Sequence, residues 1–285
     1  MAVPPPFAGV VNFAHQGGAR EGPSSTLWAM RRAVAAGADA LELDVHVTAD
    51  RRLVVCHDAT LDRTTDGTGR IAELTLAQVQ TLDNAHWWVP GSVVDHEADP
   101  AAYPLRGRAP ADPELVVPTL EAVLEALPDT LVNLDIKETA PTVEPYEGLL
   151  ADLLRAHGRG HDVIVASFHD AALEVFSTLA PEFATAAGTA ATAGFYLALR
   201  QGQPRPPMRH QALQVPPVFQ GVTVVDEAFV EAAHADGLAV QVWTIDETDE
   251  MTSLLDLGVD GIMTDRPSVL ADVLAAREAD RVERD

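Results

Sequence analysis

Short apolar runs alternate with segments of helical spacing along most of the chain, and this alternation limits the folds open to it. A first strand over Gly9–Ala14, a helix over Thr26–Ala36 and a second strand over Ala40–Val45 begin the pattern, and Ser24 or Ser25 is the expected cap of the helix. Six further apolar runs follow, at Thr130–Ile136, Val163–Ser167, Phe183–Ala187, Ala212–Val215, Ala239–Trp243 and Gly261–Thr264. The helices beside them are expected near residues 119–127, 145–157, 171–179, 227–235, 247–257 and 267–277. Eight strand–helix units predict an α/β fold, a TIM-type (β/α)8 barrel with parallel strands.

Residues 1–285 are expected to form one domain, because barrels of this kind commonly reach this length as a single domain. Three stretches do not fit the simple alternation. Leu53–Cys56 predicts a strand that returns beside residues 40–45 in a hairpin. Residues 83–117 are rich in proline and show little periodicity, which predicts an insertion over the mouth of the barrel. Residues 189–210 are assigned to no regular element.

The net charge of −24 argues against nucleic acid as a partner, because binding to a phosphate backbone needs a basic patch. It also repels anionic substrates, so a phosphodiester site here would need a metal cation and a local lysine or arginine. No stretch predicts an integral membrane segment, and the single cysteine, Cys56, forbids an intrachain disulfide. Residues 1–6 lack the features of a secretory signal, so a cytoplasmic location is expected. These features do not indicate an oligomeric state.

Four residues with metal-binding or proton-transfer side chains lie at or near the predicted strand ends: His15, Glu42, Asp44 and His57. Residues i and i+2 of a strand share a face, so the carboxylates of Glu42 and Asp44 point the same way. Neighbouring carboxylates repel one another, and a divalent cation with oxygen ligands is the usual remedy. A two-residue hairpin loop near residues 50–51 would set His57 across from Asp44. The group is therefore interpreted as a metal-assisted hydrolase site.

Eight short segments together resemble the glycerophosphodiester phosphodiesterase family, in the right order and over nearly the whole chain. The segments are His15–Gly18, Pro23–Thr26, Gly37–Val45, Val54–Asp58, Leu61–Thr65, Leu134–Lys137, Val242–Thr244 and Gly258–Pro267. The resemblance implies a TIM-type barrel that hydrolyses glycerophosphodiesters to glycerol phosphate and an alcohol. It also implies one divalent metal ion, calcium or magnesium, and a small-molecule substrate.

The resemblance and the positions at strand ends give each candidate residue a role. Glu42, Asp44 and Asp135 are the expected metal ligands, and Lys137 would meet the phosphate or the leaving oxygen. His15 and His57 would act as general acid and general base, in an order that the sequence leaves open. The substrate-binding candidates are Gln16, Lys137, Phe168 and Trp243; the two aromatic side chains would either stack on the glycerol or alcohol group or pack at the rim.

Three positions depart from the family pattern. Gln16 stands where the family has an arginine, which removes a bidentate phosphate clamp. Ser24-Ser25 replaces Glu-Asn, and Asp135 is one methylene shorter than the family's glutamate. If the family's arginine and glutamate form a pair, the loss of both avoids leaving one charge uncompensated.

Two alternatives remain open at this stage. The first is a phosphodiesterase of the same superfamily that cleaves another phosphodiester or a phospholipid. Lipid substrates would predict an apolar mouth, with Trp87, Trp88 and Val89 as candidates. The second is a non-catalytic barrel that binds phosphate esters; two histidines beside two carboxylates argue against it, because a binding module needs no general acid and base.

Overall fold

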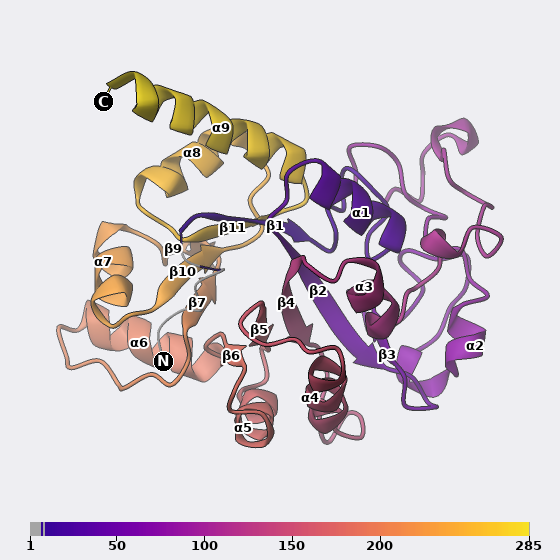
Figure 1. The fold of residues 1–285 in the computed structure, drawn as a ribbon, viewed down its shortest axis with the longest axis horizontal. Coiled ribbons are helices and arrows are strands. Elements are labelled where there is room, and N and C mark those ends of the chain that lie inside the picture. The colour runs from indigo at the N-terminus through magenta and orange to yellow at the C-terminus, as the bar shows by residue number, and fades with distance from the viewer. Residues whose placement is uncertain (1–6, 8, 285) are drawn as a thin grey trace.

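Eight parallel strands form a nearly closed barrel in the computed structural model, which describes residue 7 and residues 9–284 (Figure 1). The strands are β1 (Val11–His15), β2 (Ala40–Val47), β4 (Leu131–Ile136), β5 (Val163–Ala166), β6 (Ala184–Thr185), β7 (Ala212–Val215), β10 (Ala239–Val242) and β11 (Gly261–Thr264). Each pairs with its neighbour in the order β6-β5-β4-β2-β1-β11-β10-β7. A single parallel bridge, Ala186 to Ala212, joins the two ends of this order. All eight predicted strands and the TIM-type barrel are therefore confirmed.

Helices surround the strands, as expected for alternating strand–helix units (Figure 1). They are α1 (Leu27–Ala35), α2 (Leu76–Val79), α3 (Leu120–Ala126), α4 (Glu147–Ala156), α5 (Asp170–Leu179), α6 (Thr189–Arg200), α7 (Glu227–Ala235), α8 (Thr248–Asp256) and α9 (Pro267–Arg284). Short 3-10 helices are η2 (Ile71–Glu73), η3 (Pro100–Ala102) and η4 (Pro113–Leu115). Thr26 caps α1, since its side chain accepts a hydrogen bond from the amide of Ala29, so the expectation that Ser24 or Ser25 would cap it is wrong.

The alternation of side chains along β2 separates the core from the site. Leu41, Leu43 and Val45 are fully buried in the cluster of apolar residues that includes α4 and α5 side chains. Glu42 and Asp44 point to the other face, into the barrel, as residues i and i+2 of one strand must. Hydrophobic burial on the outer face of the sheet thus fixes which carboxylates face inward.

The β2–β3 hairpin differs from the prediction by one residue. β3 spans Leu53–Val55, and the register pairs Val45 with Val55, so Cys56 lies opposite Asp44 in place of His57. The amide of Thr48 donates to the carbonyl of Arg52, which leaves three residues in the turn. Arg51 takes the left-handed conformation, with φ of 61°, that three-residue hairpin turns use.

Two regular elements lie where none was assigned or expected. Residues 189–200 form α6, a segment for which the sequence predicts no regular element. A small antiparallel hairpin follows β7, formed by β8 (Val218–Phe219) and β9 (Val222–Thr223). Gln220 and Gly221 have φ of 50° and 79°, the pair of positive values that a type I′ turn requires.

The irregular segment over residues 83–117 is present, but it lies beside the barrel mouth and not over the central cavity. The indole N–H of Trp88 donates to the carbonyl of Ala19, and the ring centroids of Trp88 and Trp28 in α1 are 6.1 Å apart. Asn84 donates to the carbonyl of Ser24. None of residues 83–117, all of which are described, lines the cavity. The apolar mouth expected from Trp87, Trp88 and Val89 is therefore not formed by these residues.

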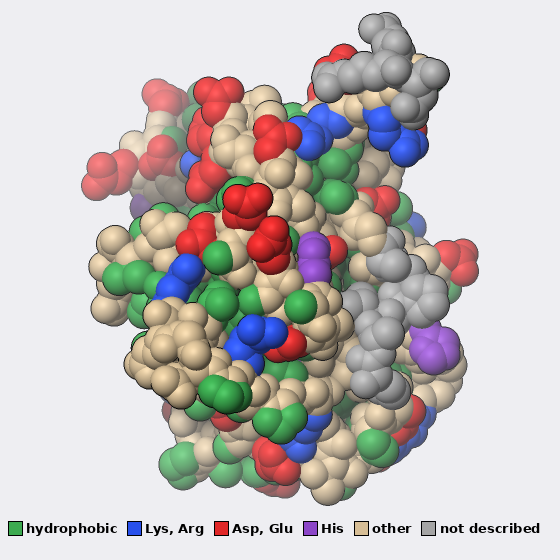
Figure 2. All heavy atoms as spheres, turned by 90° about the vertical axis from the view of Figure 1, so that its left-hand side faces the viewer, with side chains coloured by type: hydrophobic (Ala, Val, Ile, Leu, Met, Phe, Trp, Pro, Cys, Tyr) green, Lys and Arg blue, Asp and Glu red, His purple; other side chains and the backbone are tan. Residues whose placement is uncertain are grey.

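Within residues 9–284, no helix is long and apolar enough to cross a membrane. The segment considered for a secretory signal, residues 1–6, lies outside the described residues. Figure 2 shows one face of the molecule, on which acidic side chains gather in the upper part, in keeping with the net charge of −24.

Candidate active site

A cavity of about 630 Å³ opens at the carboxyl ends of the barrel strands, where active sites of such barrels lie. Eight of the nine predicted site residues line it: His15, Glu42, Asp44, His57, Asp135, Lys137, Phe168 and Trp243. They come from the ends of β1, β2, β4, β5 and β10 and from the segment after β3. The fold thus gathers these residues around one space, whereas their individual roles stay predictions.

His15 is the last residue of β1 and is held by a carboxylate from the opposite end of the sequence. Its Nδ1 lies 2.7 Å from Oδ1 of Asp265, which directly follows β11. Burial alone lowers the pKa of His15, but the hydrogen bond with Asp265 and the charges of Glu42 and Asp44 outweigh it and raise the pKa to about 9. His15 is therefore an imidazolium at neutral pH in the metal-free protein.

His57 has a carboxylate partner of the same kind. Its Nδ1 lies 2.6 Å from Oδ1 of Asp58. Arg63 holds that carboxylate from the other side, with Nε donating to Oδ2 at 2.6 Å. Burial alone would raise the pKa of Asp58, but the hydrogen bonds with His57 and Arg63 hold it well below its usual value. The ring centroids of His15 and His57 are 6.2 Å apart, so two carboxylate-oriented imidazoles face one cavity.

Three carboxylates and one lysine form the charged floor between the histidines. Nζ of Lys137 lies 3.1 Å from Oδ1 of Asp44 and 3.3 Å from Oδ2 of Asp135. Burial first, and then the charge of Asp44, raises the pKa of Glu42 to about 8. Burial also raises the pKa of Asp135, although Lys137 opposes it. Burial lowers the pKa of Lys137, but the charges of Asp44 and Asp135 outweigh it and raise the pKa overall.

Two oxygens in this floor are buried without a hydrogen-bond partner: Oδ2 of Asp44 and Oδ1 of Asp135. An unpaired buried carboxylate oxygen costs free energy, and a cation is the partner that removes this cost. Together with Glu42, these oxygens supply the hard anionic ligands that calcium and magnesium prefer. The residues present therefore fit a divalent cation.

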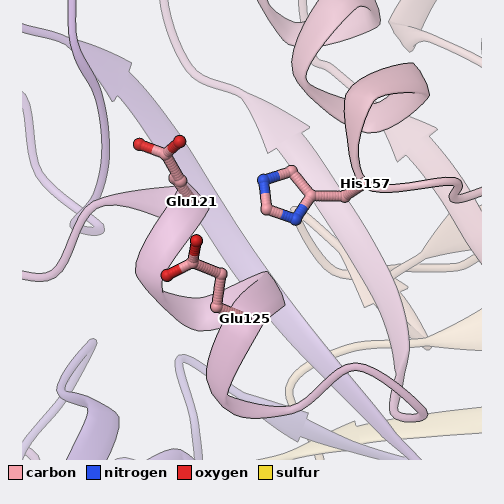
Figure 3. Close-up of side chains that lie close together, drawn as sticks. All are labelled: Glu121, Glu125 and His157. Carbon is pink, nitrogen blue, oxygen red and sulfur yellow. The ribbon is translucent and has the colours of Figure 1, made fainter.

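A second group of possible metal ligands lies outside the cavity. Among the described residues, only Glu121, Glu125 and His157 offer three ligand atoms that all lie within 4.8 Å of one another. Figure 3 shows the two glutamates one turn apart on α3 with the His157 ring facing them. Glu121 already binds Arg52, at 2.9 Å, and none of the three lines the cavity. In the cavity, the ammonium of Lys137 lies between the carboxylates of Asp44 and Asp135.

Gln16 is the one predicted site residue that does not line the cavity. It is buried behind His15, with Nε2 3.3 Å from Nε2 of that histidine. Its Oε1 accepts a hydrogen bond of 2.6 Å from the hydroxyl of Ser24. A protonated His15 would require the Gln16 amide to turn over, which exchanges its donor and acceptor ends. Gln16 therefore does not reach the cavity in this structure. It does contact Ser24, as expected if residues 16 and 24 correspond to an arginine–glutamate pair in the family.

Phe168 and Trp243 stand together at the mouth. Their ring centroids are 5.7 Å apart in an edge-to-face arrangement, and Nζ of Lys137 lies 5.9 Å from the centroid of Phe168. Both rings border the cavity, so an apolar surface begins directly beside the lysine.

Sequence reasoning missed the two carboxylates that orient the histidines. Asp58 follows His57 directly, and Asp265 follows the last strand, so the rule of polar residues at strand ends would have found both. It also missed an amide network inside the barrel, where Nε2 of Gln214 donates to Asn133 and Gln241 at 2.7 and 2.8 Å. Asn133 shares the strand face of Asp135 by the i, i+2 rule, which is the signal that was available.

Known proteins of one kind resemble this chain in sequence and fold. A family model described as the glycerophosphoryl diester phosphodiesterase family matches residues 15–269. A glycerophosphodiester phosphodiesterase from Caldanaerobacter subterraneus subsp. tengcongensis is 30% identical over 268 residues, which cover 92% of this chain and 96% of that protein. The crystal structure of a glycerophosphodiester phosphodiesterase from Agrobacterium tumefaciens has a TM-score of 0.67 at 26% identity and covers 92% and 99% of the two chains. A phosphodiesterase from Oleispira antarctica in complex with the product sn-glycerol-3-phosphate has a TM-score of 0.72 at 23% identity, with 94% and 98% covered.

Proposed function

Because the chain belongs to the glycerophosphoryl diester phosphodiesterase family, we propose that it hydrolyses glycerophosphodiesters to glycerol phosphate and an alcohol with a divalent metal and two histidines. It is accordingly a phosphoric diester hydrolase. One observation carries the finer proposal: two histidines, each bound to an aspartate through Nδ1, face a cavity that also holds three buried carboxylates and a lysine.

The two histidines divide the proton transfers between them. His15, whose pKa is raised to about 9, is protonated at neutral pH and serves as the general acid. His57 serves as the general base, since its Nδ1–H donates a hydrogen bond to Asp58 and its Nε2 is left to accept a proton. A water attacks phosphorus and gives its proton to His57, the bond from phosphorus to the alcohol oxygen breaks, and His15 protonates that oxygen. Asp265 and Asp58 act as positioning residues that fix the tautomer of each ring.

Glu42, Asp44 and Asp135 would hold the metal ion. When bound, a divalent cation neutralises charge that builds on the phosphate oxygens. Binding would also quench the negative charges that raise the pKa of His15, while its hydrogen bond with Asp265 remains. Lys137 supplies a second positive charge next to the phosphate, in a chain whose net charge repels that group.

Hydrolysis of three substrates tests the proposal: glycerophosphocholine, glycerophosphoinositol and an artificial aryl phosphodiester, each with magnesium, calcium or manganese. We expect release of glycerol phosphate from the first two, loss of activity with a chelator, and recovery with one of the metals. His15→Ala and His57→Ala should each lower turnover by about 10²–10⁴-fold. A control variant, His157→Ala, changes a histidine outside the cavity and should keep full activity. Full activity in His57→Ala would remove the general base from the mechanism, and no hydrolysis with any metal would favour a non-catalytic binding barrel.

A further inference from the structure

Asn84, a buried residue of the irregular segment 83–117, joins two parts of the chain that lead to the two histidines. Its side chain is 1% exposed. The amide Nδ2 donates to the carbonyls of Ser24 at 3.1 Å and Ser25 at 3.3 Å, and Oδ1 accepts a hydrogen bond of 2.5 Å from the hydroxyl of Thr64. Both ends of the amide are therefore paired, which fixes its orientation and ties residues 24 and 25 to residue 64.

The first of these parts leads to His15. The hydroxyl of Ser24 lies 2.6 Å from Oε1 of Gln16, and Nε2 of Gln16 lies 3.3 Å from Nε2 of His15. A hydroxyl can donate or accept, so Ser24 remains a partner of Gln16 when that amide turns over. Gln16 and Ser25 have φ of 52° and 56°, a left-handed conformation that residues other than glycine seldom adopt. The surrounding hydrogen bonds must hold this conformation, and those of Asn84 are among them.

The second part leads to His57. Thr64 directly follows Arg63, whose Nε and Nη2 donate to the two carboxylate oxygens of Asp58 at 2.6 and 3.2 Å. Asp58 in turn holds Nδ1 of His57 at 2.6 Å. The hydrogen bond from Thr64 to Asn84 thus fixes the backbone next to the guanidinium that orients this carboxylate.

Other residues of the irregular segment hold the same stretch of backbone. The indole N–H of Trp87 donates to the carbonyl of Thr65 at 2.8 Å, and Nε2 of His96 lies 3.1 Å from the carbonyl of Arg63. The rings of Trp87 and His96 are stacked, with centroids 4.6 Å apart. Residues 63, 64 and 65 are therefore each bound by this segment, although none of residues 83–117 borders the cavity. The segment thus supports the His57 side of the site from outside.

We propose that Asn84 is a positioning residue that sets the distance between His15 and His57. Their ring centroids are 6.2 Å apart, and the two rings come from separate parts of the chain, at the end of β1 and after β3. In the proposed hydrolysis, on which this inference rests, the general acid and the general base act at one phosphorus atom, so their spacing must be kept. One buried amide bonds to both parts, and its loss lets one ring shift relative to the other. A misplacement of about 1 Å can lower a rate about 100-fold.

Two substitutions remove the hydrogen bonds on which this role depends. Asn84→Ala leaves the carbonyls of Ser24 and Ser25 without their donor. Thr64→Val removes only the hydroxyl that donates to Asn84, and it carries the test if Asn84→Ala fails to fold. In both variants kcat for glycerophosphocholine should fall about 10- to 100-fold with KM nearly unchanged, because the proposed metal ligands and Lys137 are left intact. Thr64→Ser, which keeps the hydroxyl, should regain most of the rate that Thr64→Val loses.

The leaving group of the substrate separates positioning from a general loss of structure. The alkoxide of choline needs a proton from the general acid, whereas an aryl oxide leaves with little protonation because a phenol is the stronger acid. A shift of His15 relative to His57 should therefore lower kcat for glycerophosphocholine more than kcat for an aryl phosphodiester. The ratio of the aryl rate to the glycerophosphocholine rate should rise in Asn84→Ala and in Thr64→Val. A purely structural role would lower both rates equally.

Asn12 provides a matched control. It is fully buried on β1, and its Nδ2 donates to the carbonyls of Gly37 at 3.2 Å and Pro267 at 2.9 Å, the same kind of double bond to the main chain that Asn84 makes. Asn12 does not border the cavity. Asn12→Ala should therefore lower the melting temperature, as Asn84→Ala does, but keep the kcat and the substrate ratio of the wild-type protein.

The possible results separate this inference from the function on which it rests. Wild-type kcat in a folded Asn84→Ala variant, or equal losses for the two substrates, overturns the positioning role and leaves the phosphodiesterase standing. An equal fall of kcat in Asn12→Ala and Asn84→Ala overturns it as well, as does a crystal structure of Asn84→Ala in which the spacing of His15 and His57 is unchanged. Absence of hydrolysis by the wild-type protein for every substrate and metal overturns the phosphodiesterase proposal and, with it, the role of Asn84.

Discussion

The substitution Asp265→Asn tests the electrostatic basis of the proposed general acid. Asp265 contributes two of the four interactions that raise the pKa of His15 from 6.5 to about 9, including the largest, the hydrogen bond at Nδ1. One opposite charge at contact distance shifts a pKa by about 1–3 units, which corresponds to about 1.4–4 kcal/mol. The burial of His15 is already included in the value of about 9, so the pKa in the variant should fall to about 6–8.

The fall in pKa has a calculable effect on turnover. At pH 8 a group with a pKa of about 9 is about 90% protonated, whereas one with a pKa of about 7 is about 10% protonated. Turnover is proposed to need bound metal, which quenches the charges of Glu42 and Asp44 and leaves Asp265 as the main group that raises the pKa of His15. Loss of Asp265 should therefore lower kcat/KM about tenfold for each unit by which the pKa of His15 falls below the assay pH, and the loss of ring orientation should lower it further. The falling limb of the pH–rate profile should move to lower pH, whereas a purely structural role would lower the profile without moving it.

Two measurements on the metal-free protein check the same argument. Titration of the His15 ring followed by NMR should show the lower pKa directly. The folded pKa of His15 is raised above its unfolded value, so its stabilising contribution is present below about pH 6.5 and disappears as the pH rises through about 9. The difference in free energy of unfolding between wild type and Asp265→Asn should therefore shrink over that range.

The control is a second histidine–aspartate pair outside the cavity. His234 and Asp260 lie 2.8 Å apart on the surface of the barrel, and Asp260→Asn should leave both kcat/KM and the His15 titration unchanged. An unchanged pKa of His15 in Asp265→Asn would refute the reasoning, because the closest charge would then have no influence on the ring.

Three further predictions concern the charged floor and its surroundings. The folded pKa of Glu42, about 8, lies above its unfolded value, so the free energy of unfolding of the metal-free protein falls as the pH rises between about 4.5 and 8. At pH 9 with chelator, Glu42→Gln should therefore have a higher melting temperature than wild type. Added calcium or magnesium should not raise the melting temperature of this variant. Lys137→Met leaves the buried carboxylates of Asp44 and Asp135 without their partner, so the free energy of unfolding should drop by about 3–5 kcal/mol. Added metal should restore part of this loss. A denaturant midpoint equal to that of wild type would contradict the prediction. Gln16→Arg alone should lower activity, because the new cation would lie beside protonated His15. Adding Ser24→Glu should restore part of the activity, with a coupling of about 0.5–3 kcal/mol in a double-mutant cycle. Strictly additive effects would reject the hypothesis that residues 16 and 24 act as a pair.

The sequence predicted the barrel because eight short, mostly apolar runs recur between segments of helical spacing, and this alternation indicates parallel strands joined by helices. It did not predict α6, because an Ala/Thr/Gly-rich stretch with Gly194 shows no clear helical stripe. The β8–β9 hairpin escaped notice because each strand has two residues and neither is buried. Both α6 and the hairpin border the cavity, so the sequence located the charged side of the cavity and missed part of its apolar side.

The predicted site residues converge because each lies within or shortly after a strand, and parallel strands end on one side of a barrel. The partners of these residues were harder to find. Asp265 is 250 positions from His15, and no local pattern connects them. The register error at His57 has a local cause, since a turn of three residues with Arg51 at positive φ shifts the pairing by one. The metal, the cytoplasmic location and the single-domain organisation stay predictions.

The pairing of β1 with β11 has a consequence for the newly made protein. The two strands pair from Val11 with Gly261 to Ala14 with Thr264, which places Asp265 beside His15. During synthesis the first strands emerge and can begin to fold while β11 has not yet been made. The carboxylates of β2 can assemble at that stage, but the first histidine has no aspartate until the last strand is released and inserts between β1 and β10. Nascent chains and C-terminal truncations that stop before β11 should therefore be unable to cleave phosphodiesters, so activity begins only when the whole barrel is complete.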